Sequence, residues 1–160
     1  MRALILLALL ASPTLADPLT GKSYIIQLSS SQYASGYGKY LLPPLVKVLK
    51  TSGMTSKDGP GADVVVNVTP DSDVGKWVGT GAVRQWTYTI TVMVGISPES
   101  YDIPEDGTPV FGVRAALSTP NSDSEAEMDC MITLAARVAL RDYKPTGIEK
   151  VDGQSCLGAR

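Results

Sequence analysis

The chain has 160 residues, with 14 basic and 16 acidic side chains and no histidine, so its formal net charge at pH 7 is −2. The basic residues are few and dispersed, so the sequence provides no basic patch of the kind that binds nucleic acid. The lack of histidine excludes Ser-His and Cys-His nucleophile pairs and the common zinc sites, and it removes the usual general base at neutral pH.

The first residues have the pattern of a cleavable secretory signal. Basic Arg2 precedes an apolar run over residues 3–11, and small residues lead up to Ala16. We therefore expect residues 1–16 to be a signal peptide and residues 17–160 to be a single domain. The apolar run is about half as long as a membrane-spanning helix requires, so the mature chain is expected to have no transmembrane segment and to be periplasmic or secreted.

The first half of the mature chain predicts one strand and one helix. Residues 23–28 (SYIIQL) form a short apolar run that fits a buried strand. Leucine and valine then recur at helical spacing over residues 41–49. Pro43 and Pro44 have no amide donor and fit only the first turn of a helix, so the regular helix is expected over residues 43–52.

Two strands joined by a loop are predicted next. Residues 62–70 are rich in β-branched side chains and end at Pro70. Residues 83–96 alternate between apolar and polar side chains, which predicts one covered face and one largely solvated face. Residues 71–81 (DSDVGKWVGTG) join these two strands and fit a long hairpin connection. A bound ion is the alternative for this loop, although the glutamate of a calcium loop is missing from its place.

A further strand over residues 110–118 and a second helix complete the predicted elements. Ser124 and Glu127 make a capping box, and an apolar stripe follows them. The element order is therefore strand, helix, three strands, helix (β-α-β-β-β-α). Two helices on one face of a mostly antiparallel sheet of about four strands would bury every apolar stripe, which predicts an α+β two-layer sandwich.

The two cysteines, Cys130 and Cys156, are expected to form a disulfide bond, because the chain is predicted to enter an oxidising compartment. Cys130 falls on the second predicted helix. The bond would tie a tail over residues 145–160 back to the domain. A redox-active pair is disfavoured, because such pairs usually occupy a Cys-x-x-Cys motif.

Three tyrosines form the strongest candidate binding segment in the sequence. Tyr33, Tyr37 and Tyr40 lie within eight residues, among Ser, Gly and Gln. Tyrosine offers contact area and a hydroxyl at little entropic cost, which suits an adaptable binding surface. The alternative is that these rings only cover the start of the helix.

The order of these elements resembles that of small envelope lipoprotein domains of Gram-negative bacteria, such as the lipopolysaccharide-assembly lipoprotein family. The resemblance covers residues 23–144 and lies in the element pattern, from SYIIQL through the strands ADVVVNV and RQWTYTITVMVGI to the helix after SEAEMDC. The cysteine of a lipoprotein signal is missing, so a lipid anchor is not carried over. The resemblance implies a non-catalytic accessory protein that binds another envelope component.

These observations predict a secreted or periplasmic, non-catalytic binding or accessory module of the bacterial cell envelope, with an envelope protein or glycan as partner. No cofactor, metal or nucleic acid is expected. One alternative is a small carboxylate-dependent hydrolase, for which Asp71 and Asp73 are the candidate pair. Another is a structural subunit that assembles through a sheet edge. The sequence leaves the oligomeric state open.

Overall fold

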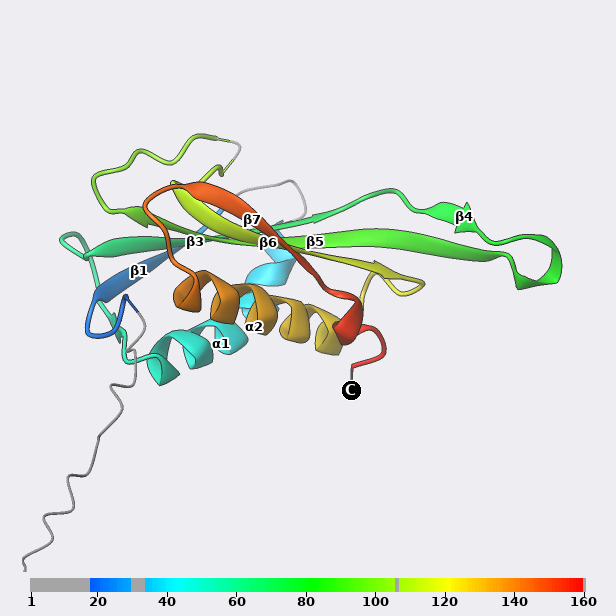
Figure 1. Ribbon diagram of the computed structural model, residues 1–160, viewed down its shortest axis with the longest axis horizontal. Coiled ribbons are helices and arrows are strands. Elements are labelled where there is room, and N and C mark those ends of the chain that lie inside the picture. Colours follow the sequence, from blue (N-terminus) through cyan, green and yellow to red (C-terminus); the bar gives the residue numbers. More distant parts are fainter. Residues whose placement is uncertain (1–17, 30–33, 106, 160) are drawn as a thin grey trace, which may run out of the picture.

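Two helices, α1 (Ala34–Thr51) and α2 (Glu125–Arg141), cover one face of a large mixed sheet (Figure 1). The computed structural model describes residues 18–29, 34–105 and 107–159, and the side chains of residues 34–39 are not among the parts described. The predicted two-layer arrangement, with both helices on one face, is confirmed.

The sheet has seven strands within the described residues: β1 (Ser23–Leu28), β2 (Thr55–Ser56), β3 (Val64–Ser72), β4 (Lys76–Val78), β5 (Gln85–Pro98), β6 (Phe111–Thr119) and β7 (Gly147–Asp152). Their order is β2-β1-β3-β5-β6-β7, and β4 pairs with β5 alone. The central pairs are antiparallel, whereas β1 is parallel to β2 and β3, and β6 is parallel to β7. The prediction of about four mostly antiparallel strands is therefore wrong in strand number and in the direction of the outer pairs.

The parallel pairs follow from the two helices. A helix between two strands carries the chain across the sheet, so the next strand can run in the same direction as the first. In this way α1 connects β1 to β3 and α2 connects β6 to β7. The strands that the sequence did not reveal are β2, with two residues, β4, with three exposed residues, and β7, a largely exposed strand at the sheet edge.

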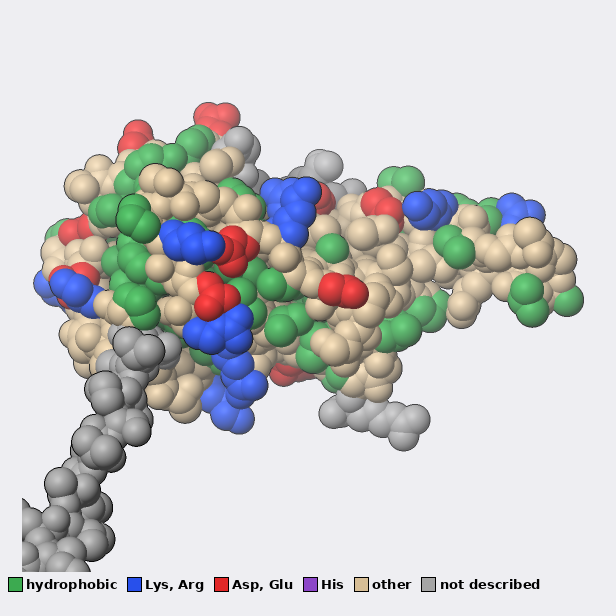
Figure 2. All heavy atoms as spheres, in the orientation of Figure 1, with side chains coloured by type: hydrophobic (Ala, Val, Ile, Leu, Met, Phe, Trp, Pro, Cys, Tyr) green, Lys and Arg blue, Asp and Glu red, His purple; other side chains and the backbone are tan. Residues whose placement is uncertain are grey.

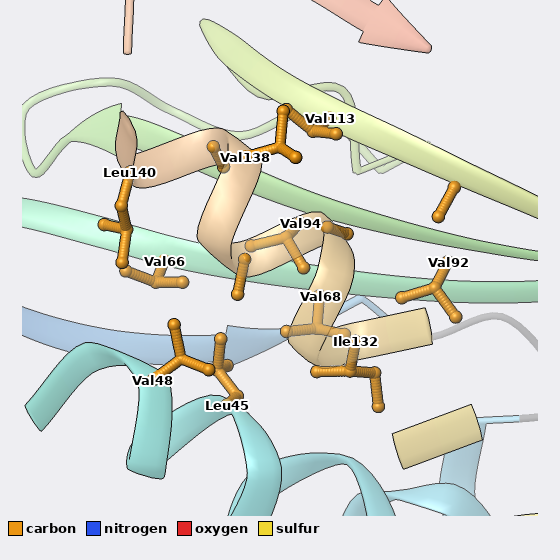
Figure 3. Close-up of a cluster of buried hydrophobic side chains, with 14 of the residues drawn as sticks. Leu45, Val48, Val66, Val68, Val92, Val94, Val113, Ile132, Val138 and Leu140 are labelled. Atoms are coloured by element: carbon orange, nitrogen blue, oxygen red, sulfur yellow. The ribbon is translucent and has the colours of Figure 1, made fainter. Parts of the chain in front are cut away.

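The hydrophobic core lies between the helix layer and the inner face of the sheet (Figure 3). Its labelled side chains come from both helices and the three central strands: Leu45, Val48, Val66, Val68, Val92, Val94, Val113, Ile132, Val138 and Leu140. All ten are buried. The alternation of β5 predicted this inner face correctly, because every second residue from Ile90 to Ile96 is in the core.

Helix α1 begins earlier than the prolines predicted. It starts at Ala34, nine residues before Pro43, and both prolines lie inside it. Leu41 and Leu45, on either side of the proline pair, are fully buried, and their packing holds the helix through the positions where amide donors are missing.

Strand β3 also continues past a proline, to Ser72. The amide of Ser29 donates to the Val68 carbonyl at 3.1 Å, so the backbone polar groups of Val68 and, two residues on, Pro70 face the β1 side. Pro70 lies beyond the part of β3 that pairs with β1, which ends at Leu28, so its missing amide removes no hydrogen bond from the β1–β3 ladder.

The start of α2 matches the predicted cap in part. The Ser124 hydroxyl accepts a hydrogen bond from the Glu127 amide at 3.3 Å. The Glu127 carboxylate does not return to Ser124 but accepts from the Gly158 amide at 2.8 Å. Together with the confirmed Cys130–Cys156 disulfide, whose Cα atoms are 5.5 Å apart, this contact holds the C-terminal segment against α2.

The outer face of the sheet is less open than predicted. The loop between β5 and β6 folds over it, and the Asn67 amide group donates to the Gly107 carbonyl at 2.7 Å. The Ser97 hydroxyl accepts from the Val110 amide at 3.0 Å. As a result Met93 and Ser97, on the outer face of β5, are buried. None of the described helices is both long and apolar enough to cross a membrane.

Candidate functional site

A hairpin that projects beyond the rest of the sheet is the most distinctive surface feature of the protein. Strand β5 pairs with β3 from Ile90 onward and with β6 from Tyr88 onward, whereas its first residues pair only with β4. Residues 73–87, which contain β4 and the short 3-10 helix η1 (Gly81–Val83), therefore extend away from the body (Figure 1). We call this segment the arm. The predicted hairpin connection is confirmed, and it is longer than predicted.

Asp73 fixes the base of the arm. Its Oδ1 accepts hydrogen bonds from the Thr89 amide at 2.8 Å and from the Gly75 amide at 3.0 Å. The hydrogen bond from the Thr89 backbone is the main reason why the pKa of the Asp73 carboxyl is lowered. The carboxylate thus serves as an acceptor that ties the two strands of the arm together.

Aromatic side chains meet across the arm. Trp77 of β4 is directly opposite Trp86 of β5, and their ring centroids are 5.3 Å apart with the rings nearly perpendicular. The Arg84 guanidinium lies 4.6 Å from the centroid of Trp77, in a cation–π contact. Gly75 has a φ of +77°, and a Cβ there would collide with the indole of Trp86. Glycine at this position lets the indole lie against the backbone.

The arm concentrates exposed apolar surface. Five of the seven large hydrophobic side chains exposed in the described residues belong to it: Val74, Trp77, Val78, Val83 and Trp86. Val74 is 88% exposed and Val83 is 79% exposed. Figure 2 shows hydrophobic and basic side chains along the projecting part of the molecule. A two-stranded ribbon cannot bury these groups by itself, so they remain available to a partner.

The charge of the arm is opposite to that of the body. Lys76 and Arg84 are exposed, and no acidic residue occurs between Asp73 and Glu99. The arm carries +1, from Lys76 and Arg84 against Asp73, in a chain of net charge −2, so the remaining residues carry −3. The arm is therefore a cationic, aromatic projection on an acidic protein.

The predicted tyrosine segment is described only in part. Tyr33 and the side chain of Tyr37 lie outside the described residues. Tyr40 lies in α1, in the helix layer, and is half-buried. The expectation that these three residues form a binding surface stays a prediction.

The carboxylates that the sequence raised as candidates have separate environments. Asp71 lines a hollow of about 340 Å³ on the outer face of the sheet, together with Arg114, and its Oδ1 accepts from the Ser72 amide at 2.9 Å. Asp73 is occupied by the arm amides. Among the residues that the structure describes, no group of three or more acidic or cysteine side chains could hold a metal ion.

A second hollow, of about 560 Å³, lies between α1 and α2. Its lining includes Pro43, Lys47, Arg137 and the disulfide. Burial, followed by the charge of Glu125, raises the pKa of Asp129 in this groove. Among the described residues, no ionisable side chain forms a hydrogen bond with the buried Oδ1 of Asp129. The lining of the groove mixes polar and apolar side chains and does not favour a particular ligand.

The sequence predicted the hairpin and raised its carboxylates as candidates, but it did not single out the tryptophans as a binding surface. The signals were present: both tryptophans of the chain are Trp77 and Trp86, and the segment after Asp73 has basic but no acidic residues. The sequence could not show that β3 and β6 pair with only part of β5. The remaining part of β5 carries Trp86 beyond the body, opposite Trp77 of β4.

Comparisons with known proteins give a likeness in structure but none in sequence. No protein-family model matches the chain, and no curated protein matches it in sequence. Among solved structures, a minor lipoprotein from Acinetobacter baumannii is similar with a TM-score of 0.48 and 16% identity, over 79% of this chain and 98% of that chain. At this level the likeness assigns neither family nor function. The resemblance to the lipopolysaccharide-assembly lipoprotein family is thus not confirmed.

Proposed function

We propose that this protein is a non-catalytic binding module of the cell envelope and that it contacts its partner through the arm. The exposed aromatic and apolar side chains on the arm carry this proposal, because contiguous apolar surface on a soluble domain is typical of an interaction site. Trp and Arg are also the side chains most often found at the energetic centres of interfaces.

The location in the envelope is supported by two independent features. The N-terminal sequence has the pattern of a secretory signal, and the Cys130–Cys156 disulfide suits an oxidising compartment. The tyrosines at positions 33, 37 and 40 remain a proposed second contact, on α1 and the segment before it.

The hydrolase alternative gains no support from the site geometry. Asp73 would have to exchange protons, but its hydrogen bonds to two amides favour the ionised form and hold the carboxylate toward the backbone. Asp71 faces a hollow with Arg114 instead. We therefore propose binding rather than catalysis.

Retention of the protein in its native envelope tests the proposed function. Trp77→Ala removes an exposed ring that contacts Trp86 and Arg84, and we expect retention to weaken by about tenfold or more, the loss typical of an interface hot spot. The amount of tagged, crosslinked protein that co-purifies with envelope material measures the effect.

Leu157→Ala is the matched control for this experiment, because Leu157 is an exposed apolar side chain on the C-terminal segment, away from the arm. Both variants should keep the thermal unfolding midpoint of the wild type, because both side chains are exposed. Equal retention of wild type, Trp77→Ala and Leu157→Ala would contradict the proposed role of the arm.

A further inference from the structure

The chemistry of the arm points to one class of partner. We propose that the arm binds the interface of a bilayer containing anionic phospholipid, with its tryptophans and valines at headgroup depth and its two basic side chains at lipid phosphates. This inference rests on the proposed function and names the surface that the arm contacts.

The composition of the arm matches the lipid–water interface. Tryptophan favours this region because its ring is largely apolar while its indole N–H remains able to donate a hydrogen bond. The exposed Val74, Val78 and Val83 add apolar surface to the arm, and Val78, next to Trp77 on β4, places part of it on the opposite face of the ribbon. A side chain such as Lys76 can keep its charge in water while its aliphatic stem lies along apolar surface.

Charge complementarity sets the orientation. Lys76 and Arg84, with Asp73 at the base, give the arm a net charge of +1, whereas the rest of the chain carries −3. An anionic surface attracts the arm and repels the body, so the protein would touch the membrane by the projection and hold its sheet and helices away from it.

The shape of the arm suits a flat, extended surface. Residues 85–87 pair only with β4, so neither β3 nor β6 flanks this part of the hairpin. The arm extends beyond both helices (Figure 1), so a bilayer can contact the arm without contacting the helix layer.

Purified full-length mature protein and vesicles of defined composition test the inference. Because Trp77 and Trp86 are the two tryptophans of the chain, intrinsic tryptophan emission reports only on the arm. We expect the wild type to sediment with phosphatidylcholine vesicles that contain phosphatidylglycerol, and its emission to shift to shorter wavelength. Binding to phosphatidylcholine alone should be about 30-fold weaker, since each basic residue near an anionic surface contributes about fivefold.

Paired variants distinguish the effect of the arm's charges from the effect of the protein's net charge. Lys76→Gln with Arg84→Gln should lower binding to the anionic vesicles by about 30-fold. Lys50→Gln with Lys150→Gln removes two exposed positive charges from the body and should leave binding unchanged. Val83→Asp should abolish the emission shift, whereas Leu157→Asp should retain it.

Three results would overturn the inference. The first is a wild type that does not bind anionic vesicles, and the second is binding that the loss of Lys76 and Arg84 leaves unchanged. The third is a concentration-dependent dimer that forms through the arm, which would make a second copy the occupant. If envelope retention still depends on Trp77 while vesicles are not bound, the proposed function stands and the partner is a protein or glycan. If retention does not depend on Trp77, the proposed function itself fails.

Discussion

At the scale of single residues, Asp63 shows how a surface carboxylate can fasten an edge of the fold. Its Oδ2 accepts from the Ser23 amide at 2.8 Å and from the Ser23 hydroxyl at 2.7 Å, and its Oδ1 lies 3.2 Å from the Lys22 ammonium. The Ser23 amide is the main cause that lowers the pKa of Asp63 to about 2. The charged form of this side chain therefore holds the start of β1 against the start of β3.

This lowered pKa predicts a specific pH dependence. Because the pKa is lower in the folded than in the unfolded chain, Asp63 contributes stability above pH 4, and this contribution is lost as the pH falls from about 4 to about 2. Asp63→Asn should therefore lower the urea midpoint at pH 6, and the difference from wild type should shrink toward pH 2. Asp58→Asn, in the exposed loop between β2 and β3, is the control. A difference between wild type and Asp63→Asn that stays constant with pH would contradict this prediction.

At the scale of elements, the disulfide joins α2 to the 3-10 helix η2 (Gln154–Cys156). The bond closes a loop with a sequence separation of 26 residues. Replacing Cys130 and Cys156 by alanine should lower the free energy of unfolding by roughly 3.5 kcal/mol, the chain-entropy value for a loop of this length. Equilibrium urea denaturation measures the loss, and reduction of the wild type should reproduce it. A loss below about 1 kcal/mol would mean that β7 and the Glu127–Gly158 contact hold the segment without the bond.

The elements also show what the sequence could and could not predict. The alternation in β5 and the Ser124 cap were visible because each depends on local pattern. Helix α1 was predicted too short because Pro43 was taken as its start, while the buried Leu41 and Leu45 hold the helix on both sides of it. Strand β7 was missed because its exposed edge position leaves no strong apolar pattern, and only its parallel pairing with β6 defines it. The arm depends on the relative lengths of three strands, which no local pattern encodes.

At the scale of the whole molecule, the free energy of local unfolding should decrease along β5 from the core toward the arm. Its residues from Ile90 to Ile96 are hydrogen-bonded between β3 and β6 and have their alternate side chains in the core. Residues 85–87 pair only with the three residues of β4, and isolated two-stranded ribbons are marginally stable. The body can therefore stay folded while the arm opens, since the hydrophobic core of the described residues includes no residue of the arm.

Amide hydrogen exchange on the isolated protein measures this gradient. We expect amides of β5 in residues 92–96 to exchange near the rate of global unfolding, and those of residues 85–87 to exchange at least about 100-fold faster, because local opening costs only part of the global free energy. If the arm opens independently of the body, a partner must order the arm as it binds. The protection of the amides of residues 85–87 from exchange should therefore rise when anionic vesicles are added. The protection of residues 92–96 should not change. Equal protection along all of β5 in the free protein would show that the arm is an extension of the rigid core, and binding would then proceed without this ordering step.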